Sequence, residues 1–258
     1  MGFDVAAEAY DRFMGRYSSL LSPQMADFAG VAAGQRALDV GSGPGALTAE
    51  LVPRLGAESV TAVDPSEPFV EAVRARNPGV TVLAAGAEAL PFDDDSFDVA
   101  IAQLVVHFMA DPVAGLAEMH RVTRPGGVVA ACVWDLAGGR APLSAFWNVA
   151  RELDPDVADE SKMAGAREGH LVELFEAAGL RDVKAAALPV SHEHAGFDDW
   201  WQPYELGVGP AGAYVARLDD DHRAALRERA RAVMPRGPFT VTAWAWAARG
   251  VSPQGTAG

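Results

Sequence analysis

Short apolar runs alternate with longer amphipathic segments through the first half of the chain. The runs are expected to form strands over 36–40, 59–63, 80–85, 97–103 and 128–134. Between them apolar residues recur at helical spacing, as at Leu47, Leu51 and Leu55, which predicts a buried stripe on a helix. This alternation is typical of βαβ units, so the pattern predicts an α/β protein with a parallel sheet.

The pattern becomes less regular beyond residue 134. It predicts helices over 146–153, 170–178 and 219–234, and strands over 183–190 and 239–247. Insertions at about 138–170 and 197–236 are rich in aromatic residues, which suit an apolar substrate pocket because ligands of open α/β sheets bind at the carboxyl ends of the strands. We expect Trp147, Trp200 and Trp201 in this pocket, while packing of the insertions explains other aromatic residues. The adjacent pair is favoured because two tryptophans beside acidic residues seldom both face a core.

The composition excludes several classes of protein. The 258 residues include 35 Asp and Glu against 21 Lys and Arg, a net charge of −14 that disfavours nucleic acid as a partner. The single cysteine, Cys132, excludes an internal disulfide scaffold. No apolar stretch approaches the ~18 residues of a membrane span, and the first residues are acidic, unlike a signal peptide. We expect a cytoplasmic monomer or homodimer with a leader at 1–30, one domain at 31–250 and a flexible tail at 251–258.

A glycine-rich turn follows the first predicted strand. Gly41, Gly43 and Gly45 allow the backbone to approach a ligand closely, and Asp64 follows at the end of the second strand. This spacing indicates an adenosine-type cofactor, NAD or another, with a purely structural turn as the alternative. Spacing alone does not choose between these cofactors.

Four ordered motifs within residues 5–135 indicate which cofactor is bound. They are 38–45, 88–92 with 96–99, His107 before 111–112, and 121–127. Together they resemble class I S-adenosylmethionine-dependent methyltransferases, in particular the ubiquinone/menaquinone-biosynthesis branch. The resemblance implies a Rossmann-like, mostly parallel seven-stranded sheet with the last strand antiparallel, and helical insertions that form a substrate lid. It also implies S-adenosyl-L-methionine as the cofactor.

The resemblance further implies a role for individual residues. Asp39 would hold the methionine ammonium, and Asp64 the two ribose hydroxyls. Pro65 would lie against adenine. The backbone amides that would follow the methionine and ribose belong to Gly41, Ser42, Gly43 and Gly45.

Other expected contacts flank this loop. Relatives commonly carry Asp where this chain has Gly86, so adenine would instead meet the Ala87 amide, with Glu88 or a water replacing the carboxylate. Gln103 would lie beside the methyl group, or serve only a structural role. Arg16, in a leader that would fold over the cofactor, could pair with the methionine carboxylate or lie on the surface.

Few residues suggest acid–base or metal chemistry. His107 is the candidate general base, although capping or packing of the following helix also explains it. Tyr17 belongs to the leader, where it would line the substrate pocket or pack in the lid. His192 and His194 form a possible metal-ligand pair that is also typical of a polar strand end, and we predict no metal.

The predicted reaction is methyl transfer to a small, largely apolar biosynthetic metabolite at oxygen, nitrogen or carbon. A reactive sulfonium needs mainly in-line positioning and exclusion of water. The competing hypothesis is a protein of the same fold that binds the cofactor without transferring a methyl group, and Gly86 and Phe108 are the departures that favour it.

Overall fold

A central sheet organises the molecule, for which a computed structural model describes residues 7–253. The strands are β1 (Ala37–Val40), β2 (Val60–Asp64), β3 (Thr81–Ala84), β4 (Phe97–Gln103), β5 (Thr123–Trp134), β6 (Arg181–His194) and β7 (Phe239–Val251). Their order is β3-β2-β1-β4-β5-β7-β6. Only β7 runs antiparallel to its neighbours, β5 and β6, as predicted.

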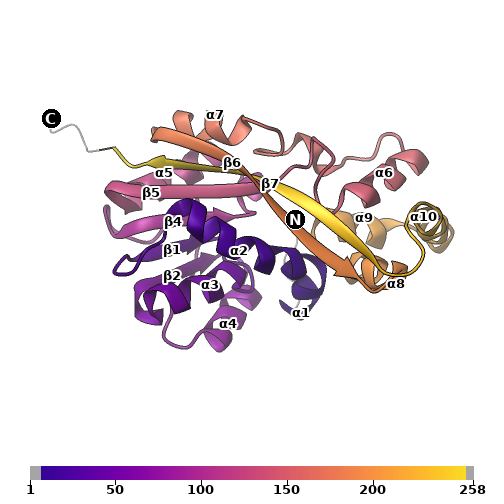
Figure 1. The fold of residues 1–258 in the computed structure, drawn as a ribbon, viewed down its shortest axis with the longest axis horizontal. Coiled ribbons are helices and arrows are strands. Elements are labelled where there is room, and N and C mark those ends of the chain that lie inside the picture. Colours follow the sequence, from indigo (N-terminus) through magenta and orange to yellow (C-terminus); the bar gives the residue numbers. More distant parts are fainter. Residues whose placement is uncertain (1–6, 254–258) are drawn as a thin grey trace.

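Helices cover the sheet, and further helices lie beyond one end of it. They are α1 (Ala7–Tyr10), α2 (Arg16–Ala29), α3 (Ala46–Leu55), α4 (Glu67–Arg76), α5 (Pro112–Val122), α6 (Ser144–Leu153), α7 (His170–Ala177), α8 (Phe197–Trp201), α9 (Gly209–Arg217) and α10 (Asp220–Val233). Short turns of helix are η1 (Asp11–Gly15), η2 (Ala57–Ser59), η3 (Val106–Phe108), η4 (Glu160–Lys162) and η5 (Gln202–Leu206). Figure 1 shows α2 in front of the sheet, while β6 and β7 extend towards α6, α8, α9 and α10.

Helix ends follow local chemistry. The Asp111 carboxylate accepts a hydrogen bond from the Ala114 amide and Pro112 opens α5, as expected at a helix start. Asp219 caps α10 in the same way, and acidic residues of its first turn complement the helix dipole. None of the helices within 7–253 has the length and apolarity needed to cross a membrane.

The last three strands are longer than their apolar runs predict. β5 begins at Thr123, which pairs with Phe97, although the following Arg-Pro-Gly-Gly sequence predicts a turn. β6 continues to His194 and β7 to Val251. The edge strand β6 is largely exposed, so it needs no continuous apolar run. Its hydrogen-bonded pairing with β7, which the apolar pattern does not reveal, defines its length.

Candidate active site

A cavity of about 250 Å³ lies at the carboxyl ends of β1 and β2. The glycine loop, the starts of α3 and α4, the end of β4 and the leader enclose it. Its wall consists of Tyr10, Ser18, Asp39, Gly41, Ser42, Gly43, Pro44, Ala46, Leu47, Asp64, Pro65, Ser66, Phe69, Gln103, Leu104, Val105 and Phe108. We call it the first cavity.

Glycine is required in the loop for two different reasons. Gly41 has φ 68° and a Cβ there would lie 2.6 Å from the Val105 side chain, so this position admits no larger residue. Gly43 also has positive φ, but nothing lies within 4 Å of its Cβ position, which leaves the backbone open to a ligand. Gly45 lies outside the cavity wall, and its Cβ position faces Val73 and Asn77 at the packing contact with α4.

Two buried carboxyl groups face the first cavity. The Asp39 carboxylate accepts a hydrogen bond of 2.6 Å from the Thr48 hydroxyl, and Asp64 accepts one of 2.8 Å from each of the Gly43 and Ser66 amides. Burial raises the pKa of Asp39 to about 7, with Asp64 adding to the rise and Thr48 opposing it. Burial also raises the pKa of Asp64, against the two amides. Two carboxyl groups without an ion-pair partner in residues 7–253 form a site suited to a cation and to hydroxyl donors.

Gln103 presents an unpartnered acceptor to the same cavity. Its amide nitrogen donates to the Ser18 carbonyl and the Ser22 hydroxyl of α2, whereas its Oε1 is buried without a hydrogen-bond donor. The next residue, Leu104, has φ 63°, a conformation that is strained for a bulky side chain. The end of β4 therefore combines backbone strain with an open hydrogen-bond acceptor.

The leader closes the cavity from the side of α4. Tyr10 contacts Phe69 edge to face, with ring centroids 5.5 Å apart, and Asp11 forms a 2.8 Å ion pair with Arg76. Arg76 also donates to the Pro44 carbonyl in the glycine loop. Leader, loop and α4 are thus joined around the first cavity.

Some predicted cofactor contacts lie elsewhere. Ala87 and Glu88 are outside the wall of the first cavity, and the Glu88 carboxylate accepts a 2.8 Å hydrogen bond from the Ala110 amide ahead of α5. Arg16 is also outside it and donates to Asp199 and His194, because α2 places its guanidinium against β6 and α8. Phe69 also belongs to the wall, a position that no sequence motif predicted.

A second cavity of about 30 Å³ adjoins the first, sharing Tyr10, Leu104 and Phe108 with it. Its other wall residues are Phe13, Met14, His107, Trp134, Leu136, Leu143, Glu160, Val208, Gly209 and Pro210. His107 lies here, with a buried and unpartnered Nδ1, and burial lowers its pKa to about 3. No sequence motif pointed to Glu160, the carboxyl group among these wall residues.

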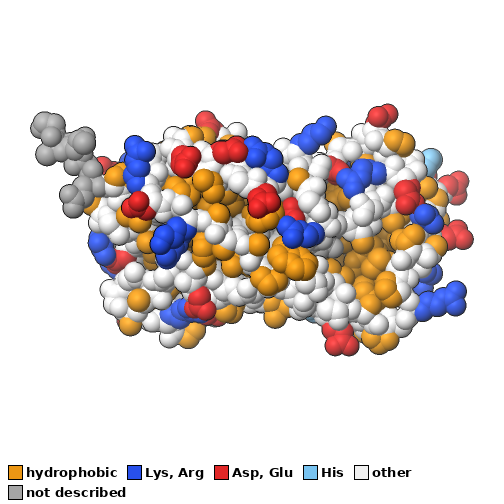
Figure 2. All heavy atoms as spheres, turned by 45° about the horizontal axis from the view of Figure 1, so that its top comes forward, with side chains coloured by type: hydrophobic (Ala, Val, Ile, Leu, Met, Phe, Trp, Pro, Cys, Tyr) orange, Lys and Arg blue, Asp and Glu red, His pale blue; other side chains and the backbone are white. Residues whose placement is uncertain are grey.

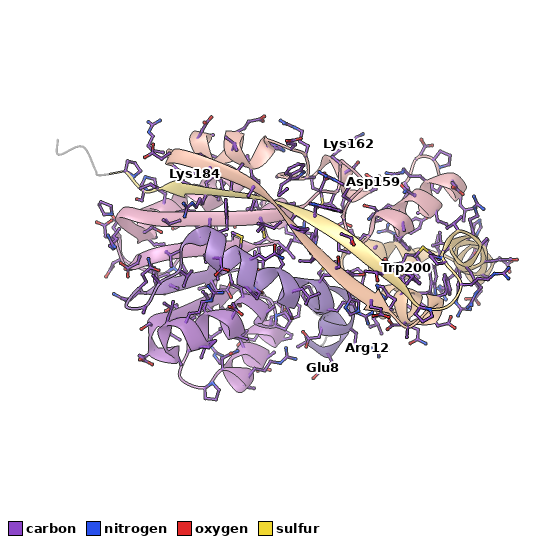
Figure 3. The ribbon with its side chains drawn as sticks, in the orientation of Figure 1. Glu8, Arg12, Asp159, Lys162, Lys184 and Trp200 are labelled. Atoms are coloured by element: carbon purple, nitrogen blue, oxygen red, sulfur yellow. The ribbon has the colours of Figure 1, made fainter. Side chains whose placement is uncertain are left out.

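The tryptophans of the insertions form a core. Trp200 and Trp201 are 2 % and 0 % exposed, so the expectation that two adjacent tryptophans would not both face a core is wrong. They pack with Phe146, Phe197 and Tyr204, and these aromatic residues belong to the same hydrophobic core as the strands of the sheet. Figure 3 places Trp200 at this end of the molecule.

Only part of the predicted substrate pocket reaches a cavity. Tyr17 and Trp200 line a small third cavity of about 10 Å³ with Arg16 and His194. Trp147 and Trp201 line none of the three, and the Trp147 indole nitrogen donates instead to Glu160.

We expect Trp201→Phe to lower the free energy of unfolding by roughly 1–2 kcal/mol, since it leaves a small cavity and removes the 2.7 Å indole bond to Glu205. Because Trp201 is not part of the wall of the first cavity, ligand affinity there should change less than about twofold. Thermal unfolding and calorimetry measure the two quantities. A large loss of affinity without loss of stability would contradict this assignment.

The two histidines of β6 meet the leader. Potential ligand atoms of His192, His194 and Asp199 lie within 4.8 Å of one another. An Arg16 nitrogen, however, lies 3.3 Å from His194 Nδ1 and 3.2 Å from an Asp199 oxygen, while Tyr17 bonds His194 Nε2 at 2.7 Å. The Arg16 guanidinium therefore already places a positive charge beside these potential ligand atoms. Its contacts, together with the Tyr17–His194 hydrogen bond, join α2 to β6 and α8.

Comparison with known proteins identifies the family. Residues 38–131 match the methyltransferase domain family. The demethylmenaquinone methyltransferase of Mycobacterium sp. (strain KMS) is 35 % identical over 168 residues, which cover 60 % of this chain and 71 % of that protein. The chain belongs to the class I S-adenosylmethionine-dependent methyltransferases. The four motifs and the topology lead to the same family.

Further relatives share less of their length. The 2-methyl-6-phytyl-1,4-hydroquinone methyltransferase 2 of rice is 36 % identical over 151 residues. These residues cover 58 % of this chain and 40 % of the rice protein. This chain therefore spans less than half of that relative. The structure of Haemonchus contortus phospholethanolamine N-methyltransferase 2 with S-adenosylhomocysteine superposes with a TM-score of 0.56 at 16 % identity, covering 95 % of this chain and 59 % of that one. That likeness concerns the fold alone.

Proposed function

We propose that the chain binds S-adenosylmethionine in the first cavity and transfers its methyl group to a small, largely apolar metabolite. The observation that carries this proposal is the pair of carboxyl groups, Asp39 and Asp64, facing one cavity beside an open glycine loop. An amino acid joined to a nucleoside presents an ammonium and a vicinal diol. The ammonium matches the buried Asp39 carboxylate, which has no cationic partner among residues 7–253, and the diol matches the Asp64 carboxylate, which two amides already orient. Phe69 and Pro65 add an apolar surface suited to adenine.

In such a reaction the residues of the chain bind and orient the reactants. The bound cofactor would supply an already electrophilic methyl group on its sulfonium. Asp39 and Asp64 bind two different parts of the ligand. The buried Oε1 of Gln103 accepts a hydrogen bond from it, and the leader excludes water from the cavity. Orientation and water exclusion are the contributions that such a transfer needs.

The acceptor enters through the second cavity in this proposal, since its wall is continuous with that of the first through Tyr10, Leu104 and Phe108. Relatives named for menaquinone and hydroquinone substrates support an apolar acceptor. The negative net charge and the interspersed acidic and basic side chains on the face in Figure 2 support a metabolite rather than a nucleic acid.

Calorimetry with S-adenosylhomocysteine and NAD tests the cofactor assignment. We expect binding of the former and none of the latter, because the loop and Asp39 match the amino-acid end that NAD lacks. Radiolabelled S-adenosylmethionine incubated with a metabolite extract then tests transfer. NAD binding alone would overturn the assignment, and cofactor binding without labelled product would favour the non-transferring alternative.

A further inference from the structure

Glu160 is a buried carboxyl group that neither the fold nor the cofactor requires. It opens η4 in the insertion between α6 and α7 and is 4 % exposed. Figure 3 labels two residues of the same segment, Asp159 and Lys162. Its Oε2 accepts a 3.0 Å hydrogen bond from the Trp147 indole. Within residues 7–253 no basic side chain pairs with it and no donor reaches its Oε1. Burying an unpaired carboxyl group is costly, so a ligand role would explain its presence.

The surroundings of Glu160 define the ligand. Phe13, Trp134 and Leu136 line the same second cavity, which suits an apolar or aromatic body. His107 contributes a further polar group, and its unpartnered Nδ1 is available for a second hydrogen bond. The cavity holds about 30 Å³, about the volume of one water, so a ligand body must widen it while a single hydroxyl fits as it stands.

Building on the proposed methyl transfer, we propose that Glu160 is the general base for an acceptor hydroxyl group on an apolar, aromatic body. As the hydroxyl oxygen forms its bond to the methyl carbon, the carbon–sulfur bond breaks and its electron pair stays on sulfur. The electron pair left on sulfur neutralises the sulfonium, and the hydroxyl proton moves to the Glu160 carboxylate, which becomes a neutral carboxylic acid. The protonated carboxyl group then returns its proton to solvent when the product leaves.

The electrostatic setting suits this role. Burial raises the pKa of Glu160 to about 7, the Trp147 hydrogen bond opposes the rise, and Asp159 adds to it. The other titratable groups around this cavity are Tyr204 and Tyr10, whose pKa values are both raised chiefly by burial, and His107. A base that titrates near neutral pH both accepts a proton and releases it during a catalytic cycle.

Matched variants isolate this carboxylate. Glu160→Gln retains an acceptor for the Trp147 indole, and Glu168→Gln makes the same change at an exposed position of the same insertion. Calorimetry with S-adenosylhomocysteine should give affinities within about twofold of the unsubstituted protein for both. Carbon NMR of labelled glutamate should show one carboxyl group that titrates near pH 7 and disappears only in Glu160→Gln.

Methylhydroquinone and phenethylamine serve as probes of the acceptor. In the presence of S-adenosylhomocysteine, methylhydroquinone should shift the Glu160 titration and bind at least tenfold more weakly to Glu160→Gln, with no change in Glu168→Gln. With S-adenosylmethionine, kcat for its O-methylation should rise with pH through about 7. Glu160→Gln should lose this rise and at least 100-fold of kcat.

Several results would overturn the role of Glu160: no glutamate titrating near neutral pH, no binding of methylhydroquinone, or equal binding and turnover by Glu160→Gln. Stronger, Glu160-dependent binding of phenethylamine would instead make the carboxylate a cation site. Failure of S-adenosylhomocysteine to bind would refute the proposed function and, with it, the methyl-transfer step. The NMR titration and methylhydroquinone binding, repeated without the cofactor, would still test separately whether Glu160 forms the binding site for an aromatic hydroxyl group.

Discussion

Replacing Asp64 with alanine is expected to weaken S-adenosylhomocysteine binding by about 2–4 kcal/mol, roughly 30- to 700-fold. The side chain lies at the end of β2, buried, and its two oxygens already accept bonds from the Gly43 and Ser66 amides. The remaining acceptor sites are therefore held in fixed directions toward the cavity. Two ribose hydroxyls would lose a charged acceptor at once, and calorimetry measures the difference.

Controls separate ligand contacts from damage to the loop. Asp64→Ala also leaves the Gly43 and Ser66 amides without their acceptor, so its thermal unfolding is measured beside its affinity. Asp64→Asn keeps one amide acceptor and should lie between the alanine variant and the unsubstituted protein. Asp93→Ala, at an exposed turn, serves as the matched change without an effect. Unchanged affinity in a folded Asp64→Ala protein would mean that the ribose is held elsewhere.

The local part of the site could be predicted because it depends on adjacent residues. Strand β1 and the loop after it follow one another in sequence, and the positive φ at Gly41 and Gly43 is the property for which glycine is suited. Asp39 lies one residue before the end of β1 and Asp64 ends the neighbouring parallel strand β2, so βαβ topology alone brings them to one edge of the sheet. These predictions required no knowledge of distant contacts.

The contacts between residues far apart in the sequence could not be predicted, because they depend on how distant segments pack together. Arg16 has the charge to bind a carboxylate, but its partner, Asp199, comes from an insertion whose position no periodicity defines. Glu160 is one of 35 acidic residues and lies in no motif, and its burial arises only when the leader, β5 and the α6–α7 insertion meet. The two tryptophans show the same limit, since their acidic neighbours suggested exposure and the long β6–β7 ribbon instead provides them with a core.

The second large effect concerns pH. Affinity for S-adenosylhomocysteine should rise about tenfold per pH unit up to about pH 7 and level off above it, because an ammonium binds the ionised form of Asp39. Asp39 is 1 % exposed, bonds only Thr48 among the residues described, and burial raises its pKa to about 7. Below that pH the ligand must displace a proton from the carboxyl group. Calorimetry across pH 5.5–8.5, a range chosen around that pKa, measures the slope.

The stability of the free protein should show the opposite dependence on pH. A carboxyl group whose folded-state pKa lies above its unfolded value of about 4 favours folding when protonated, and that contribution is lost as the pH rises from about 4 to 7. Asp39→Asn removes the loss, so at pH 8 it should unfold about 2–4 kcal/mol less readily than the unsubstituted protein while binding the ligand with a flat pH profile and much lower affinity. Asp64 shares this cavity and raises the pKa of Asp39, so the difference between the two proteins contains the loss of that repulsion as well as the loss of the Asp39 titration. A stabilised variant that kept the full pH-dependent affinity would assign the ammonium contact to another group, with the free Oε1 of Gln103 the next acceptor in the wall.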